Sequence, residues 1–511
     1  MKHNIFIKAI ILIGVLLISF SCEDFLNQEN PNKTSVEAYF KNENDVVRAV
    51  NGAYLALRSG YLLGETSTTY TEERSDNMGR LDNQSSSGEP FQFTDFSLLP
   101  SNTYLKRHWD DHFEAISRAN FALAGIESVV FESPEAKAIH KSEALFIRAL
   151  VYFHMVRKWG DVPLVTTYLQ TTDEIAAHTF REKKEVVYEQ ITKDLTEALN
   201  GNLPDIQPVS GKGRTCKAAI NGLLGQVYLT MYTTLESENK ASYLSKAKQY
   251  LSASYGMRKF NDLSEIPYSD VFNVDKKSTC PEIIFQIVYI QGDKNYSSAV
   301  ARNNQAKGET INSQYKSSGS GNFVNPDLVK EYEENDPRKD WSVKYATNPV
   351  ARNYIITKYR DTSDAAGKLG YGGNDWILMR YADIILMLAE VEMYSGNTEK
   401  AIEYLNQVRN RAGVPTYETM QSNSDYKSKY PTLKLAILHE RRVELAFENH
   451  RWYDLLRFFT PNELVTYMHA KNQNDYGISN LQNFGIKDIY YPIPFDEVKL
   501  NPEKMYQNTG Y

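Results

Sequence analysis

The stretch that most constrains the fold runs from Trp376 to Glu390 and carries apolar side chains on nearly every side. Apolar residues recur at helical spacing and others cover most of the remaining circumference, which predicts a buried helix. Gly396 follows as a stop signal, and Asn397 is a suitable N-cap for a second helix from Thr398 to Ala412. The two segments predict a helical hairpin about 36 residues long, the size of one helical-repeat unit.

Small and packing residues inside this hairpin fall where a tetratricopeptide repeat places them: Leu388, Ala389, Gly396, Ala401, Leu405 and Val408. One such hairpin alone is equally compatible with an ordinary antiparallel helix pair. Helical patterns recur, however, in residues 35–57, 109–126, 134–159, 186–200, 217–231, 241–253 and 433–447, and residues 281–289 are the one clear strand candidate. We therefore predict a mainly α fold, a tetratricopeptide-like scaffold of about four helical hairpins with long irregular loops and a few short strands.

The chain begins with the features of a secretory signal. Lys2 and Lys8 precede an apolar run of about 12 residues, which is too short to span a bilayer. The run ends in Ser21-Cys22, which is typical of a bacterial lipoprotein cleavage site, although Ser19 replaces the usual leucine. We predict that residues 1–21 are removed and that Cys22 becomes the lipid-anchored first residue. The alternative is an ordinary signal peptide followed by a chance cysteine.

Charge and cysteine content argue against several functions. The 511-residue chain has a formal net charge of −7, so neither nucleic acid nor anionic lipid is expected as its main partner. Cys216 and Cys280 can pair in an oxidising envelope, but nothing in the sequence requires it. No clustered Cys and His residues indicate zinc, and the calcium-loop-like start at residues 361–364 has Ala366 where such a loop needs glycine. We expect no metal and no cofactor.

The search for catalytic residues finds one dense charged run, from Glu440 to Glu448, and none of the common hydrolase, metalloprotease or nucleotide-binding motifs. A glycoside hydrolase needs two carboxylates on opposite sides of a cleft, about 5 to 10 Å apart. Glu440 and Glu444 lie on adjacent turns of one predicted helix and do not readily flank a sugar. The favoured interpretation is an ion-pair network between helices that includes Arg380, Arg451 and Arg457, so we predict no catalytic residue.

Two long segments without helical periodicity, residues 58–105 and 256–375, are rich in aromatic and polar residues. Such segments inside a compact protein are usually functional, and their aromatic content argues against disorder. Flat aromatic faces and Asp, Asn and Arg side chains are what sugar rings and hydroxyl pairs require. The predicted glycan contacts are Asp76, Asn77, Phe93, Phe96, Tyr104, Tyr289, Tyr296 and Tyr315. The alternative is that these aromatic residues only pack the loops onto the helices.

Motifs along the whole mature chain resemble those of the SusD/RagB family of surface lipoproteins that bind nutrients. They are Ser21-Cys22 with acidic residues after it, residues 144–149 running to 160–165, residues 380–390, residues 440–457, the Tyr-Pro-Ile-Pro of residues 491–494, and the end of the chain, residues 501–511. In such lipoproteins, acidic residues after the cysteine mark export to the cell surface. These are scaffold motifs, and they transfer no ligand site because the family's sugar contacts lie in variable loops.

The resemblance implies one α-helical domain over residues 22–511, with an N-terminal part (22–255) and a C-terminal part (256–511). It implies a partner, a TonB-dependent outer-membrane channel of the SusC type, over which the lipoprotein sits as a lid. It implies a polysaccharide or oligosaccharide ligand, delivered from the cell surface by a protein anchored in the outer membrane. The alternatives are a peptide-capturing lid, a glycoside hydrolase, which is disfavoured, and a structural scaffold that touches no ligand.

Overall fold

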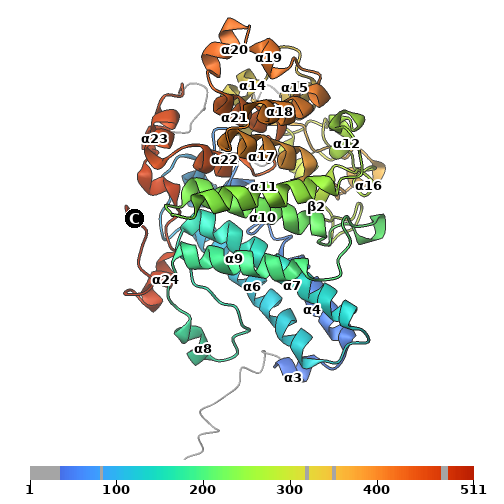
Figure 1. Ribbon diagram of the computed structural model, residues 1–511, viewed down its shortest axis with the longest axis vertical. Helices are drawn as coiled ribbons and strands as arrows, with labels where there is room; N and C mark the ends of the chain where they lie inside the picture. Colours follow the sequence, from blue (N-terminus) through green and yellow to red (C-terminus); the bar gives the residue numbers. More distant parts are fainter. Residues whose placement is uncertain (1–34, 81–84, 317–321, 348–352, 473–480) are drawn as a thin grey trace, which may run out of the picture.

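The computed structural model describes residues 35–80, 85–316, 322–347, 353–472 and 481–511, and the predicted signal and Cys22 lie outside them. The protein is mainly helical, and its long helices from α4 to α18 follow one another broadly in chain order from the bottom toward the top of Figure 1. The helices of eight or more residues are α4 (Glu43–Ala56), α6 (Thr103–Ser128), α7 (Pro134–Trp159), α9 (Lys184–Leu199), α10 (Lys217–Thr234), α11 (Lys240–Gly256), α17 (Tyr381–Tyr394), α18 (Thr398–Ala412), α21 (Leu433–Glu444), α22 (Arg451–Phe458) and α23 (Pro461–His469).

Neighbouring helices pack in a continuous series, with α4 on α6, α6 on α7, α7 on α9, α9 on α10, α10 on α11, α11 on α17, and α17 on both α18 and α21. This is the tetratricopeptide-like stack of hairpins expected from the sequence. The shorter α-helices are α3 (Val36–Tyr39), α5 (Phe91–Thr94), α8 (Thr172–Ala177), α12 (Tyr268–Val271), α13 (Val300–Asn304), α14 (Pro326–Glu331), α15 (Pro337–Ser342), α16 (Asp364–Gly367), α19 (Tyr417–Met420), α20 (Ser424–Lys429) and α24 (Phe495–Leu500).

Local sequence signals explain where the helices begin and how closely they approach. The Ser133 side chain accepts from the backbone N–H of Ala136 and Pro134 occupies the first turn, so α7 starts there. Gly160 ends α7 with a φ of 72°. Between α10 and α11, a Cβ on Gly225 would lie 2.5 Å from Cγ of Leu251, so glycine permits the close approach of these two helices.

Two small antiparallel sheets lie beside the helices. Strands β1 (Met78–Arg80), β3 (Asn322–Val324), β5 (Tyr354–Ile356) and β4 (Val343–Tyr345) form one sheet in that order. Strands β2 (Ile283–Ile287) and β6 (Trp376–Arg380) form the other, with Ile287 opposite Trp376 and Ile283 opposite Arg380. Of these strands, only β2 lies in a segment that the sequence predicts as a strand, residues 281–289.

The predicted helix at Trp376 is therefore wrong in its first turn. Residues 376–380 form β6, and the helix proper, α17, begins at Tyr381 after Arg380 as N-cap. A strand that is buried on both faces is as uniformly apolar as a buried helix, so periodicity cannot separate the two. The long helix predicted over residues 35–57 is also interrupted, because Asn42 starts α4 with its own capping box.

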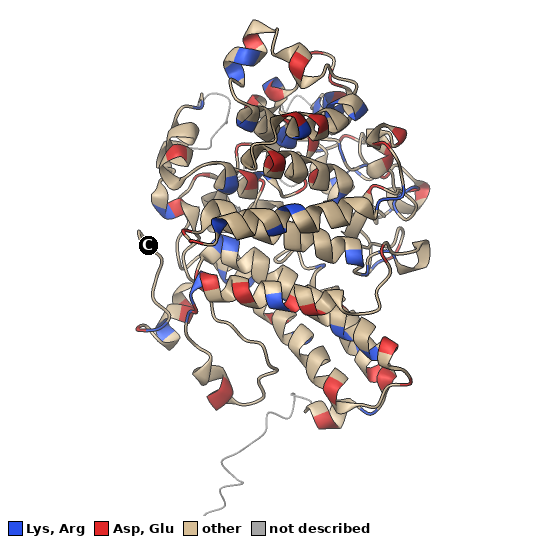
Figure 2. Cartoon of the chain, viewed as in Figure 1, with Lys and Arg blue, Asp and Glu red and all other residues tan. Residues whose placement is uncertain are grey.

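One hydrophobic cluster contains residues from Ala53 to Met505 and so joins both ends of the chain. The C-terminal tail contributes Tyr491 and Ile493 to the interior, both with no exposed area. The Tyr491 hydroxyl donates to the backbone oxygen of Tyr70. Among the residues that the structure describes, no helix combines the length and apolarity that a membrane span requires. Figure 2 shows acidic and basic residues interspersed over the face in view.

Candidate binding groove

Three adjoining hollows form one groove at the C-terminal end of α4. The side pocket has a volume of about 240 Å³. It shares Leu55 and Arg58 with the central pocket, whose volume is about 670 Å³. The central pocket shares Glu65 and Thr66 with a third hollow of about 320 Å³, which we call the tyrosine pocket because Tyr61, Tyr70 and Tyr104 line it. Shared lining residues make the three hollows one continuous surface.

Both irregular segments singled out in the sequence build this groove. Residues 58–70 and helix α6 form one side, and residues 288–304, which follow β2 and end with α13, form the other. Glu65 joins the two sides: its backbone N–H donates to the Tyr289 hydroxyl over 3.4 Å, and its carboxylate accepts from the N–H of Ala299 over 2.6 Å. Burial raises the pKa of Glu65 above its usual value. The loops are thus held to each other by a buried bond network.

Tyr61 and Tyr104 present a fixed aromatic surface in the tyrosine pocket. Their ring centroids are 5.9 Å apart, and both side chains are half-buried. The Arg107 guanidinium lies 5.2 Å from the centre of the Tyr61 ring and donates to the Tyr61 hydroxyl over 2.9 Å. Rings held in this way lose little conformational freedom on binding, which favours a ligand that stacks on them.

A buried basic cluster supports Tyr61 from beneath. The His108 ring bonds to the backbone oxygen of Tyr61 through Nδ1, and its Nε2 lies 2.6 Å from Nζ of Lys158. The Tyr70 ring stacks on His108 with a centroid distance of 3.8 Å. Burial holds the pKa of Lys158 well below its usual value, and the charge of Arg157 acts in the same direction. The groove wall therefore rests on His108 and Lys158, whose charged forms burial disfavours.

Polar groups suited to sugar hydroxyls point to the same hollows. Asn295 lines the central pocket, and Asn303 and Asn304 of α13 line the tyrosine pocket. The side-chain amides of these three residues make no hydrogen bond to another described residue, so both their donors and their acceptors are available. Arg80 is fixed in the tyrosine pocket by Glu73, whose carboxylate accepts from its Nε over 2.8 Å. The groove thus combines aromatic faces with free amides, the usual composition of a small-molecule site.

Comparison with known proteins identifies the family. The model of the SusD family matches residues 344–511, and a second model, described as starch-binding associating with outer membrane, matches residues 24–229. The chain belongs to the SusD/RagB family. Proteins of this family bind ligands and catalyse no reaction, so this SusD/RagB protein is a binding protein associated with the outer membrane and not an enzyme.

Relatives of this SusD/RagB protein match it over nearly their full length. SusD-like protein P2 of Formosa agariphila is 26% identical over 98% of this chain and 99% of its own, and a SusD-like protein of Bacteroides ovatus is 23% identical over 90% and 84%. A solved laminarin-binding SusD-like protein has a TM-score of 0.73 at 24% identity, covering 92% of this chain and all of its own. Surface glycan-binding protein A of Bacteroides thetaiotaomicron, solved with laminarihexaose, has a TM-score of 0.73 at 18% identity, covering 92% and 100%. These structures share the fold.

The structure brings three of the predicted glycan contacts together in the groove. Tyr104 lines the tyrosine pocket, and Tyr289 and Tyr296 line the central pocket. Tyr296 is 43% exposed, whereas Tyr289 is only 4% exposed and presents little more than the edge of its ring. Tyr315 is half-buried under the Arg302 guanidinium, 5.6 Å from its ring centre, and does not line any of the three hollows.

The remaining predicted contacts lie in the interior. Asp76 and Asn77 have no exposed area, and Phe93 and Phe96 are at most 2% exposed, so none of the four side chains reaches the groove surface. The Asp76 carboxylate accepts from Nε of Arg451 over 2.6 Å. Asn77 accepts from Nε of Arg442 over 3.0 Å. The physical reason is that Asp76 and Asn77 bind arginines that are buried on α22 and α21 respectively. A single sequence does not show such a pairing.

The phenylalanines take the packing role that the sequence analysis kept as its alternative. Phe93 meets the ring of Tyr70 edge-on at 5.2 Å, and Phe96 meets Phe484 at 5.0 Å. In their place, the groove uses Arg58, Tyr61, Asn295, Asn303 and Asn304, which were not among the predicted contacts. The sequence indicated only the region in which these residues lie, because all of them fall within the two non-periodic segments.

The charged run of α21 is an ion-pair network, as the favoured interpretation predicted. Glu440 lies 2.6 Å from Arg338, and Glu444 lies 2.6 Å from Arg380. Arg451 and Arg457 pair with other acids, Asp76 and Glu390 respectively. One group of potential metal ligands occurs among the described residues, Glu333, His439 and Glu440. Guanidinium groups of Arg338 and Arg409 already occupy its carboxylates, so the arrangement does not suit a cation.

Proposed function

We propose that this protein is a cell-surface glycan-binding lipoprotein that captures a polysaccharide or oligosaccharide in the groove. The supporting observation is the joined set of pockets, in which Tyr61, Tyr104 and Tyr296 offer ring faces beside Asn303 and Asn304, whose amides bond to no other residue in the described part of the chain. Ring faces cover the C–H side of a sugar, and amides pair with its hydroxyls. That a structural neighbour was solved with laminarihexaose adds support for a glycan as the class of ligand.

The proposal includes delivery to a TonB-dependent outer-membrane transporter of the SusC type, over which the protein acts as a lid. Family membership and the outer-membrane description of the matching model support this partner. In this proposal, lipidation at Cys22 keeps the protein at the membrane, and the acidic residues Glu23 and Asp24 direct it to the exterior. Metabolic labelling with a fatty acid tests the anchor, because Cys22→Ser must remove the label. Co-purification of the transporter with the lipidated chain from detergent-solubilised outer membranes tests the partner.

Affinity electrophoresis of the mature chain in gels that contain different polysaccharides tests ligand capture. We expect retardation by at least one polysaccharide. Tyr61→Ala and Tyr104→Ala should each weaken binding about tenfold, because an anchoring aromatic residue contributes more than 1 kcal/mol. Tyr417→Ala is the matched control, since Tyr417 is also half-buried and lies on α19 at the opposite end of the molecule (Figure 1).

Three other outcomes have distinct meanings. Retardation by no polysaccharide together with binding of peptides would replace the glycan by a peptide ligand. Release of reducing ends by purified protein, abolished by Glu440→Gln or Glu444→Gln with the fold retained, would indicate a hydrolase. Nutrient uptake that is unchanged by alanine at the groove tyrosines would indicate a scaffold without ligand contact.

A further inference from the structure

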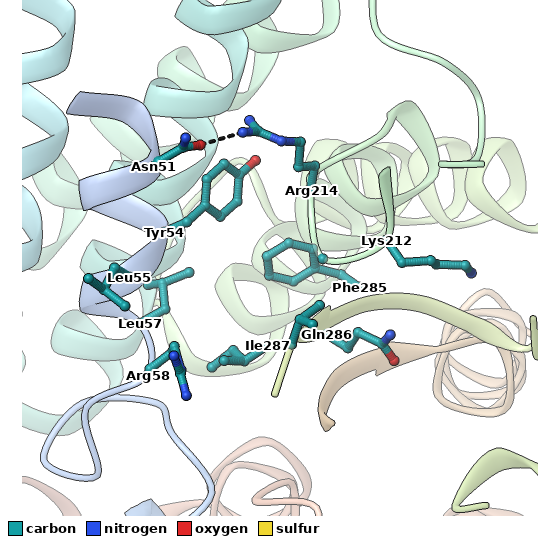
Figure 3. A pocket seen from close by; sticks show the side chains of 12 residues that line it. Asn51, Tyr54, Leu55, Leu57, Arg58, Lys212, Arg214, Phe285, Gln286 and Ile287 are labelled. Carbon is teal, nitrogen blue, oxygen red and sulfur yellow. Dashed lines mark hydrogen bonds between the residues drawn. The ribbon is translucent and has the colours of Figure 1, made fainter. Parts of the chain in front are cut away.

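The side pocket differs from the rest of the groove in its charge. Arg58 approaches it from the end of α4, while Lys212 and Arg214 approach it from the loop before α10 (Figure 3). No aspartate or glutamate is among the described residues that line it. In Figure 3, Arg58 and Arg214 mark opposite ends of the hollow, and Tyr54, Leu57, Phe285 and Ile287 lie between them. The pocket is thus an apolar hollow with cations at its rim.

Two of the three cations are already engaged by the protein. Arg214 pairs with Glu143 over 2.6 Å and also donates to Asn51. Lys212 donates from Nζ to the backbone oxygen of Ile283 over 3.3 Å, and burial lowers its pKa. Arg58 differs from both, because no ion pair joins it to a carboxylate among the described residues and its buried Nε has no hydrogen-bond partner.

Two tyrosines hold Arg58 in place of an ion pair. The guanidinium carbon lies 4.7 Å from the ring centre of Tyr289 and 4.9 Å from that of Tyr296. Stacking fixes the plane of a guanidinium and leaves its N–H edge free for a bidentate bond to an oxyanion. Because Arg58 lines both the side pocket and the central pocket, this edge lies where a bound glycan passes from one to the other.

The nearest acids do not neutralise Arg58 directly. Glu65 and Asp375 both interact with it electrostatically, and burial raises the pKa of each carboxyl. The Glu65 carboxylate is bonded to the N–H of Ala299, and the Asp375 carboxylate to Lys277 over 2.9 Å. The central pocket adds Asp111, Glu114 and Arg118, so the excess of cations is confined to the side pocket. A chain with a net charge of −7 has no general attraction for polyanions, which makes this local cluster distinctive.

We infer that the side pocket takes an acidic sugar residue of the captured glycan, whose oxyanion accepts hydrogen bonds from Arg58. The volume of about 240 Å³ accommodates one sugar ring, with its apolar face on the exposed side chains of Leu55 and Val288. The oxyanion is a uronate carboxylate or a sulfate ester, since a guanidinium binds either group in the same way. This inference rests on the proposed function, and it narrows the ligand from glycans in general to glycans that carry negative charge.

Affinity electrophoresis with three sets of gels tests the inference: neutral (laminarin, xylan), uronate-containing (polygalacturonate, alginate) and sulfated (dextran sulfate, chondroitin sulfate). We expect retardation by at least one acidic polysaccharide, weakening as NaCl rises from about 50 to about 500 mM because salt screens exposed charges. The uronate and sulfate gels identify the oxyanion. Retardation by neutral gels alone would overturn this inference and leave the proposed function intact, whereas retardation by no gel would overturn the proposed function itself.

Variants assign the effect to one side chain. Arg58→Met keeps the aliphatic stem and should weaken binding to the acidic gel about tenfold or more, since hydrogen bonds to charged groups exceed about 1.4 kcal/mol. Arg58→Lys keeps the charge without the planar fork and should restore only part of the affinity. Arg48→Met is the matched control, because Arg48 lies on α4, the helix that ends just before Arg58, has 64% of its side chain exposed and lines none of the three pockets. Equal binding by wild type and Arg58→Met, with unchanged circular dichroism, would overturn the inference.

Discussion

Replacement of Glu448 by glutamine tests whether the charged run from Glu440 to Glu448 stabilises the fold. The Glu448 carboxylate accepts from Nε and Nη2 of Arg380 over 2.7 and 2.8 Å, and it also pairs with Lys358. All three side chains are fully buried. Glutamine has the shape of the protonated acid, so Glu448→Gln removes the negative charge with little change in packing. The buried side chains of Arg380 and Lys358 then have one negative charge fewer to balance their positive charges.

The pKa of the carboxyl gives the size of the effect. The charges of Arg380 and Lys358 outweigh burial and lower the pKa of Glu448 to about 2, against an ordinary value of 4.5. At 1.36 kcal/mol per unit, the ionised form stabilises the fold by about 3 kcal/mol at neutral pH, which matches the cost of breaking a buried ion pair. Because the folded pKa is depressed, this contribution is present above pH 4.5 and is lost as the pH falls toward 2. It should drop to about 2 kcal/mol at about pH 3.5.

Urea unfolding followed by tryptophan fluorescence measures the difference in unfolding free energy between wild type and Glu448→Gln. We expect a loss of about 3 kcal/mol at about pH 7 and a smaller loss at about pH 3.5. Glu403→Gln is the control, because the Glu403 side chain is 57% exposed and pairs with Lys400, which is 44% exposed, and it should cost less than about 1 kcal/mol. A loss below about 1 kcal/mol for Glu448→Gln, or one that does not change with pH, would refute the reasoning.

Three further predictions follow from buried groups. The folded pKa of Lys158 is depressed, so unfolding takes up a proton and the unfolding free energy rises with pH below the ordinary lysine pKa of 10.5; Lys158→Met should flatten this rise, and equal slopes in both proteins would contradict it. Gly225→Ala places a methyl group against α11 and should lower the unfolding free energy by about 1–3 kcal/mol. Gly52→Ala in α4 places its methyl group in open space and should not lower the unfolding free energy. Similar melting temperatures for the two variants would contradict this prediction. Cys216 and Cys280 are buried and unpaired, so a thiol reagent should modify neither in native Cys22→Ser protein and both after unfolding; fewer than two reactive thiols after unfolding would reveal a disulfide.

The helical scaffold was predictable because its signals are local. Apolar spacing, caps and stop residues indicated the long helices, and α7 begins and ends at the predicted residues, Pro134 and Trp159. Strand β6 was missed because its partner, β2, lies far away in the chain and pairing leaves no local signature. The short strands β1, β3, β4 and β5 were missed for the same reason, since each contains three residues.

The candidate groove was predictable as a region but only partly by residue. The two non-periodic segments do meet, and Tyr104, Tyr289 and Tyr296 line the groove. Whether a polar residue in such a loop faces solvent or a buried partner depends on side chains elsewhere in the chain. Asp76 faces Arg451, which follows it by 375 positions, and nothing near Asp76 in the sequence predicts that arginine.

The pairing of Asp76 with Arg442 and Arg451 also governs how the chain matures. Synthesis and export deliver the N-terminus first, so the carboxylate exists well before either guanidinium arrives. Until then, the N-terminal half cannot bury the Asp76 carboxylate without the large desolvation penalty of an unpaired charge. Completion therefore depends on the last segment to emerge, and a prematurely terminated copy would remain loosely folded and open to proteolysis. The two family models match separate parts of the chain, residues 24–229 and 344–511, but we expect those parts to fold as a single unit.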